Sequence, residues 1–268
     1  MTEFGDELRW TFVMGGLARD YGAPGTGEAT RAAVLSGWGT HQWLLTHWLE
    51  VCADAGMPCD PLLWRDGPLI STYPSCLAVR AAAEQAPDGG YGFLRAVREG
   101  LFCFRRKLDG TEALVEEARR AGLDVERFRI DLGSHAILEA FGADLEEVRV
   151  VPDEARGLDQ VKGSGSDERL PFPTLVFEPE DGARTVLYGY RPYDELQAAA
   201  RTAGARPVTD ERPDVIEALR RFGHMATVEV AAVCDLPGPR AASELWRLAT
   251  EWRVARVPVL DGELWRAA

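Results

Sequence analysis

Lysine is scarce in this sequence, and long apolar runs are missing altogether. Only two of the 30 basic residues, Lys107 and Lys162, are lysine, and together with abundant alanine and glycine this bias suggests a GC-rich bacterial genome. No window approaches the ~18–20 consecutive apolar residues that cross a bilayer. The acidic N-terminus also lacks the basic-then-apolar pattern of a secretory signal. We therefore expect a soluble cytoplasmic protein without membrane association.

Positive charge is also in deficit. The chain carries 43 acidic against 30 basic side chains, which gives a formal net charge of −13 and an isoelectric point near 4.9. Such a balance argues against general nucleic-acid binding and against attachment to anionic lipid. A hydrophobic content of 46% over 268 residues is ordinary for a globular protein and is enough for one large domain or two smaller ones.

The cysteines and histidines show no metal or redox motif. The four histidines include no His-Glu-x-x-His pattern, and the five cysteines include no Cys-x-x-Cys pair, so we expect reduced thiols, no metal site and no cofactor. Cys52 and Cys59 are seven positions apart, which on one helix is about 10 Å and beyond the ~7 Å reach of a disulfide. The Gly56–Pro58 stretch would end that helix, so a closer approach stays open. We interpret Cys52, Cys59, Cys103 and Cys234 as small apolar core residues.

Strand patterns border a long helical block. Leu8–Met14 is β-branched and aromatic and predicts a strand, whereas residues 29–55 carry apolar side chains at helical spacing. Residues 173–177 and 185–190 predict a hairpin, and residues 193–202 predict a closing helix. Further helices are predicted in the middle of the chain at residues 75–83, 90–106, 110–121, 124–131 and 133–148.

A new series of predicted helices and strands begins after Pro207. Two short helices are predicted at 214–222 and 227–234, followed by a longer one at 240–252 and a two-stranded wing at 254–264. Three helices followed by such a wing are typical of a winged-helix domain. Residues 207–268 hold eight arginines against ten acidic residues, whereas a DNA reader presents a clear basic face. We therefore favour a docking or dimerisation module, with a possible homodimer, over DNA binding.

Several short motifs occur together in a characteristic order. They are Met14-Gly15-Gly16-Leu17, the stretch from Gly56-Met57-Pro58 to Trp64, Ser71-Thr72-Tyr73-Pro74 with Ala78 and Ala81-Ala82, Phe93-Leu94-Arg95 and Phe172-Pro173-Thr174. Together they resemble the bacterial DsbA-like family, in the branch near FrnE-type oxidoreductases and related cytoplasmic adaptor proteins. The resemblance spans about residues 1–203. It implies an α/β, thioredoxin-like fold over residues 1–206 with a large helical insertion at about 29–148, followed by a small winged-helix-like domain over 207–268.

One feature of that family has no counterpart in this chain. The family normally begins with a strand that leads into Cys-x-x-Cys at the first helix, whereas Thr2–Asp6 resembles the end of that helix. Two hypotheses follow. Either the start is assigned too far downstream, and 20 to 30 further residues would carry the motif, or the chain is a descendant without redox chemistry.

The resemblance implies thiol-disulfide exchange on protein or small-molecule substrates, although no catalytic residue can be named in this chain. A first alternative is a non-catalytic adaptor or peptide-binding protein. A second is a glutathione-dependent isomerase of the 2-hydroxychromene-2-carboxylate isomerase type. A third is a transcriptional regulator whose thioredoxin-like part senses redox state.

The resemblance also nominates a substrate-binding site. Pro173 would be a cis-proline, and Phe172 would offer backbone groups to an extended peptide. Cys76 lies near a helix start, where a thiolate could be stabilised, although a buried structural cysteine is the more common case. The full set of candidate substrate-binding residues is Gly15, Gly16, Trp38, Tyr73, Cys76, Phe172, Pro173 and Thr174.

Overall fold

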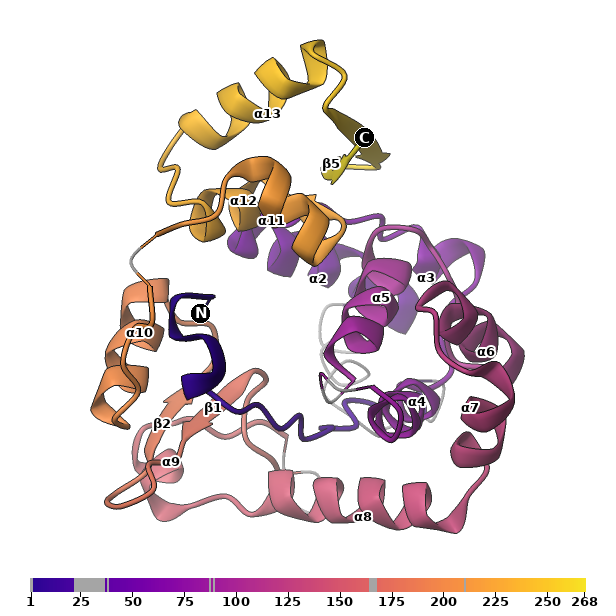
Figure 1. The fold of residues 1–268 in the computed structure, drawn as a ribbon. Helices are drawn as coiled ribbons and strands as arrows, with labels where there is room; N and C mark the ends of the chain where they lie inside the picture. The colour runs from indigo at the N-terminus through magenta and orange to yellow at the C-terminus, as the bar shows by residue number, and fades with distance from the viewer. Residues whose placement is uncertain are drawn as a thin grey trace. The chain divides into compact units, whose positions relative to one another are not determined.

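The chain forms two compact units. The computed structural model describes residues 2–21, 37, 39–86, 88, 90–163, 168–209 and 211–268 (Figure 1). We call residues 10–49 and 60–172 the helical unit, and residues 1–9, 50–59 and 173–268 the mixed unit. No helix in these described ranges is both long and apolar enough to cross a membrane.

Helices account for the regular structure of the helical unit. In chain order they are α2 (Thr40–Ala55, whose last six residues belong to the mixed unit), α3 (Leu63–Asp66), α4 (Tyr73–Ala83), α5 (Tyr91–Phe102), α6 (Thr111–Arg120), α7 (Val125–Leu132), α8 (His135–Arg149) and α9 (Asp153–Gly157). Several begin where sequence rules place a start. Pro74 occupies the first turn of α4, and the side chains of Asp124 and Ser134 accept backbone hydrogen bonds that cap α7 and α8.

Helix α4 lies at the centre of this unit and contacts α5, α6, α7 and α8 (Figure 1). Its buried face comprises Ser75, Ala78, Val79, Ala81 and Ala82, and the three alanines, each 0% exposed, let neighbouring helices approach closely. Phe93 and Phe128 pack in the same core with ring centroids 5.4 Å apart. A second cluster surrounds Trp64 and comprises Tyr21, Leu44, Trp48, Leu63, Trp64 and Leu69.

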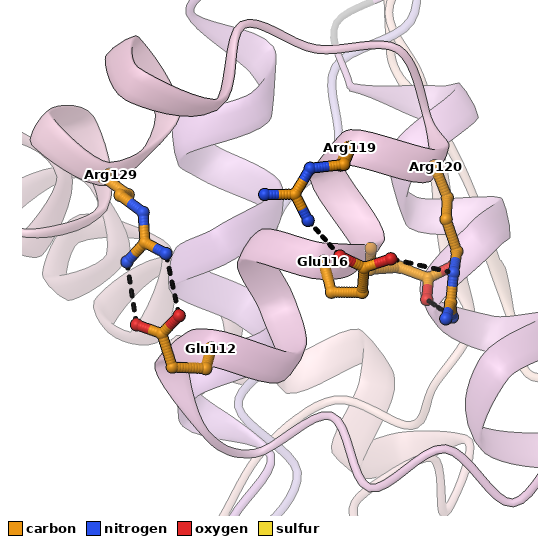
Figure 2. Close-up of polar contacts among 6 residues, drawn as sticks. Glu112, Glu116, Arg119, Arg120 and Arg129 are labelled. Atoms are coloured by element: carbon orange, nitrogen blue, oxygen red, sulfur yellow. Dashed lines mark hydrogen bonds and ion pairs between the residues drawn. The ribbon is translucent and has the colours of Figure 1, made fainter.

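Ion pairs line the surface of α6 and α7. Arg129 on α7 donates two hydrogen bonds, of 2.8 and 2.7 Å, to the carboxylate of Glu112 on α6 (Figure 2). Within α6, Glu116 pairs with both Arg119 and Arg120. These side chains are largely exposed, and exposed pairs contribute about 0–1 kcal/mol each, so the pairing of α6 with α7 depends mainly on the apolar core beneath them.

The mixed unit contains two small sheets. After the short helix η1 (Thr2–Glu7), strands β1 (Thr174–Phe177) and β2 (Thr185–Tyr188) form an antiparallel hairpin in which Leu175 faces Leu187. Helix α10 (Tyr193–Thr202) lies beside β2 (Figure 1). Phe4, Phe177, Ala199 and Ala200 form the buried cluster of this part.

The C-terminal elements of the mixed unit are α11 (Val215–Phe222), β3 (Met225–Ala226), α12 (Thr227–Val233), α13 (Arg240–Thr250), β4 (Val254–Val259) and β5 (Gly262–Ala267). The strands form an antiparallel sheet in the order β3-β5-β4. Trp265 on β5 is fully buried among Leu219, Leu245 and Leu248, and its indole N–H donates to Thr227 Oγ1 at 3.1 Å.

Most elements from residue 40 onward follow the sequence-based expectations, but the short helices α3 and α9 and the strand β3 were not predicted. The strand predicted at Leu8–Met14 is wrong. Residues 9–14 have no regular secondary structure, because no described strand lies beside them to complete their hydrogen bonds. The predicted helix start at residue 29 lies outside the described residues, and the described helix begins at Thr40. The predicted boundary at residues 206 and 207 stays a prediction, since residues 173–268 form part of one unit.

Candidate functional site

The structure places the candidate residues in three groups. Gly15, Gly16, Tyr73, Cys76 and Phe172 belong to the helical unit. Pro173, whose carbonyl accepts from Gly189 N–H at 2.8 Å, and Thr174, at the start of β1, belong to the mixed unit. Trp38 lies outside the described residues. The five residues of the helical unit therefore form the candidate site.

Side chains hold the irregular segment around Gly15 in place. The backbone N–H of Met14 donates to Asp144 Oδ2 at 3.0 Å, and the same carboxylate is paired with Arg80. A few residues later, Ala18 N–H donates to Thr72 Oγ1 at 2.9 Å, and Thr72 N–H donates back to Ala18 O at 2.9 Å. These contacts satisfy backbone groups that a strand partner would otherwise satisfy.

The two glycines allow aromatic side chains to approach the backbone. A Cβ on Gly15 would come within 3.0 Å of three atoms of the Phe172 ring. Gly16 has φ +55°, a left-handed conformation that favours glycine, and a Cβ there would lie 2.9 Å from Tyr73 Cε1 and 2.5 Å from Leu145 Cδ2. Glycine is required at both positions because a neighbouring side chain lies where a Cβ would be: the Phe172 ring at Gly15, and Tyr73 and Leu145 at Gly16.

Phe172 is an exposed aromatic ring in a defined position. Its ring packs over Gly15, and the guanidinium carbon of Arg169 lies 4.4 Å from the ring centroid, a cation–π arrangement. Nevertheless, 39% of the residue remains exposed. An aromatic ring that is held in place and still accessible loses little entropy when a partner covers it.

Tyr73 and Cys76 complete the group on α4. The Tyr73 ring meets Phe141 edge-on with centroids 5.1 Å apart, and its hydroxyl accepts from Arg149 Nη2 at 3.2 Å. Burial raises the pKa of the Cys76 thiol to about 11; a hydrogen bond from the Gly16 backbone opposes this shift, and the nearby charge of Asp144 adds to it. Because the thiolate is the reactive form, Cys76 is suited to packing and not to nucleophilic attack.

We expect Cys76 to react with iodoacetamide at pH 8 on the order of 100-fold more slowly than an unperturbed cysteine, because only a minute fraction is ionised. Peptide mass spectrometry after timed alkylation measures this rate, with the urea-unfolded chain as control. A native rate equal to the unfolded rate would contradict a half-buried Cys76 thiol that stays protonated at pH 8.

The helical unit also contains a small hollow that no sequence pattern indicated. It has a volume of about 160 Å³ and is lined by Trp10, Thr11, Phe12, Val79, Arg80 and Ala83. Pockets for small-molecule ligands usually measure ~300–1,000 Å³, so this one fits a single side chain better than a metabolite. The described residues also contain no group of three or more His, Cys, Asp or Glu side chains placed to hold a metal ion.

Comparison with known proteins places the chain in a family. A family model described as "Thioredoxin" matches residues 28–150. The ClpXP adapter protein SpxH of Halalkalibacterium halodurans is 30% identical over 224 residues, which cover 82% of this chain and 67% of that relative. This chain belongs to the same family, the DsbA-like thioredoxin proteins.

Two further proteins are similar to this chain. The SpxH protein of Bacillus subtilis, also a ClpXP adapter, is 30% identical over 227 residues, 82% of this chain and 70% of the relative. A crystal structure from Nitrosomonas europaea, provisionally described as a protein disulfide isomerase, has 20% identity and a TM-score of 0.47 over 67% of this chain and 78% of that chain. The family match confirms the expected thioredoxin-like fold, which in this DsbA-like protein is mostly helical.

The expected function needs correction. The resemblance implied a thiol-disulfide oxidoreductase, but the relatives that match 82% of this DsbA-like chain are ClpXP adapter proteins. The oxidoreductase assignment is therefore wrong. In the candidate site the one cysteine, Cys76, is half-buried and its pKa is raised, mainly by desolvation, which does not suit a redox nucleophile.

Proposed function

We propose that this chain is a non-catalytic adaptor that binds a protein substrate and delivers it to the ClpXP protease. The main support for this proposal is the 30% identity of the chain with ClpXP adapter proteins over 82% of its length. An adaptor needs an accessible recognition surface and no activated nucleophile. The exposed Phe172 ring and the protonated Cys76 thiol agree with both requirements.

The proposed recognition surface comprises Phe172, Arg169, Gly15 and Tyr73. Aromatic rings and arginines carry much of the energy of protein interfaces, especially where they are already held in position. Arg169 lies over the Phe172 ring, and Arg149 donates to the Tyr73 hydroxyl, so two aromatic side chains are each associated with an arginine. That Pro173 and Thr174 contribute backbone groups to the same partner stays a prediction.

For residues 207–268 we propose a winged-helix-like domain that serves as a docking or dimerisation module. On α13 the Arg247 guanidinium donates 2.8 and 2.7 Å hydrogen bonds to Glu244 and a 2.5 Å hydrogen bond to Glu251. A helix that reads DNA would keep such an arginine available for phosphate or base contacts. The acidic partners favour a protein partner, and the proposed setting is the bacterial cytoplasm.

A reconstituted degradation assay tests the adaptor proposal. Purified ClpX and ClpP of the source organism are mixed with ATP and a cell extract, with and without this chain, and protein loss is followed by quantitative mass spectrometry. We expect a small set of proteins to disappear severalfold faster when the chain is present, and this effect to require ClpX. Equal degradation rates with and without the chain, or acceleration that persists without ClpX, would rule the proposal out.

Replacing Phe172 by alanine should weaken binding of the protein identified in that assay at least tenfold, about 1.4 kcal/mol, because the central aromatic contact is lost. Isothermal titration calorimetry measures the affinity. Phe172→Tyr keeps the ring and should bind nearly as well, and Leu158→Ala, at a 57% exposed residue of the same unit, is the matched control. Unchanged affinity in a folded Phe172→Ala variant would remove this surface from the proposal.

A further inference from the structure

A tight reversal of the chain follows helix α2 and brings two cysteines together. The helix ends at Ala55, and Gly56 adopts φ +66°. Gly56 N–H donates to Ala53 O at 3.1 Å, and Met57 N–H donates to Cys52 O at 2.9 Å, so the chain turns back along the last helical turn. As a result, the thiols of Cys52 and Cys59 share a hydrogen bond.

The turn between β4 and β5 holds the second cysteine. Cys59 N–H donates to Asp261 Oδ1 at 2.5 Å, and Cys59 Sγ donates to Asp261 Oδ2 at 3.5 Å. The next residue, Gly262, approaches Pro58 closely, since a Cβ on this glycine would lie 3.1 Å from Pro58 Cβ. All of these residues belong to the mixed unit, so the pair forms a defined three-residue cluster of Cys52, Cys59 and Asp261.

The two thiols are not equivalent. The contact with the Cys59 thiol lowers the pKa of Cys52 against the opposing effects of burial and of the Asp261 charge, whereas the pKa of Cys59 is raised by the same contact, by burial and by Asp261. Cys52 is 6% exposed and Cys59 is 0% exposed. Cys52 is therefore both the more acidic thiol and the more accessible one, and Cys59 lies behind it as a protonated neighbour.

We propose that Cys52 and Cys59 form a redox modification site, in which a hydroperoxide converts the two thiols into an intramolecular disulfide. The Cys52 thiolate attacks the O–O bond, which gives Cys52 sulfenic acid and releases the other oxygen as hydroxide or alkoxide. Cys59 sulfur then attacks the sulfenic sulfur; the S–S bond forms, the S–O bond breaks and water leaves. The two cysteines lose two electrons, which the peroxide gains, and Asp261 Oδ2 is placed to relay the Cys59 proton to the departing oxygen, which leaves as water.

The site is a modification site of this chain and not a catalytic dithiol. Both sulfurs are buried, so a small peroxide can reach Cys52 where a protein disulfide cannot. Bond formation draws Cys59 Sγ away from Asp261 and so loosens the link between the end of α2 and the β4–β5 turn. The proposal does not depend on the adaptor function, because its test measures only the chemistry of these cysteines.

The test is a timed peroxide treatment of the intact, reduced chain, followed by alkylation and trypsin digestion. Residues 32–65 contain no lysine or arginine before Arg65, so one tryptic peptide carries Cys52 and Cys59 and no other cysteine. We expect this peptide to lose two hydrogens and both alkylation sites about tenfold faster than the Cys103 or Cys234 peptide is oxidised. A reductant should restore both free thiols of the peptide.

Variants identify the mechanism. In Cys59→Ala, Cys52 should stop at the sulfenic acid, which dimedone traps, and the two-hydrogen loss should vanish. Cys103→Ala, which removes another buried cysteine, should leave the reaction unchanged. Three results would overturn the proposal: oxidation no faster than at Cys103, gain of oxygen in place of loss of hydrogen in the native chain, or a two-hydrogen loss that persists in Cys59→Ala.

Discussion

Replacing Asp144 by alanine is expected to destabilise the helical unit by about 3–5 kcal/mol, the usual loss when one partner of a buried ion pair is removed. The Asp144 side chain is only 3% exposed and lies on α8, where it accepts from Arg80 Nε at 2.6 Å and from the Met14 backbone N–H at 3.0 Å. Without the carboxylate, a part-buried guanidinium loses this partner and a backbone donor is left unsatisfied.

The effect should extend to the candidate site. Met14 directly precedes Gly15 and Gly16, and these glycines contact Phe172 and Tyr73. Loss of the Met14 anchor therefore releases the backbone on which the Phe172 ring packs, so partner binding should weaken together with stability.

Urea unfolding followed by circular dichroism measures the change in unfolding free energy of the Asp144 variants. Asp144→Asn keeps an acceptor for the Met14 N–H and should lose less than Asp144→Ala. Glu139→Ala, on the same helix with a side chain 72% exposed, is the control and should change the free energy by no more than about 0.5 kcal/mol. An equal change in unfolding free energy for Asp144→Ala and Glu139→Ala would show that the contacts of Asp144 with Arg80 and Met14 contribute little to stability.

Replacing Trp64 by alanine is expected to destabilise the same unit by about 3–5 kcal/mol, because it opens a large cavity in the second core cluster. Trp64 is 1% exposed, and its ring meets Tyr21 and Trp48 edge-on with centroids 4.9 and 5.3 Å apart. Aromatic pairs of this geometry add to the energy of buried area, so the substitution also removes the ring contacts of both Tyr21 and Trp48.

The indole nitrogen provides a second test at Trp64. Its N–H is buried and finds no hydrogen-bond partner among the described residues. Trp64→Phe removes this unsatisfied donor and keeps most of the volume, so it should be clearly less harmful than Trp64→Ala. Trp252→Ala, at an 87% exposed tryptophan, serves as the control in the same unfolding measurement. Equal losses in Trp64→Phe and Trp64→Ala would contradict cavity formation as the main effect.

Local patterns predicted most helices well. The closing helix at 193–202 was predicted with the bounds that it has, and the C-terminal helices and strands lie within two or three residues of their predicted limits. These segments combine apolar periodicity with clear end signals such as Asp124, Ser134 and Asp214, each of which caps the helix that follows it. A capping residue acts on backbone groups within one turn of the helix that it caps. Such a short-range signal can be read directly from the amino-acid sequence.

The candidate site was only partly predictable. The close approach of Gly15 and Gly16 to Phe172 and Tyr73 agrees with residues that the family resemblance nominated. Asp144, which holds Met14, carried no local signal, because an acidic residue on α8 looks like any solvated helix position until its distant partners are known. The same holds for Leu8–Met14, whose strand-like composition could not reveal that no described strand pairs with it.

By itself, the sequence determined the positions of most helices and of the hairpin and the membership in the DsbA-like family, because these follow from local periodicity and ordered motifs. Only the tertiary structure decided which polar groups are buried together. The spacing of Cys52 and Cys59 suggested separated apolar residues, yet the turn at Gly56 and the carboxylate of Asp261, some 200 positions away, bring their thiols into contact. Contacts of this kind depend on the path of the whole chain, and no local pattern encodes that path.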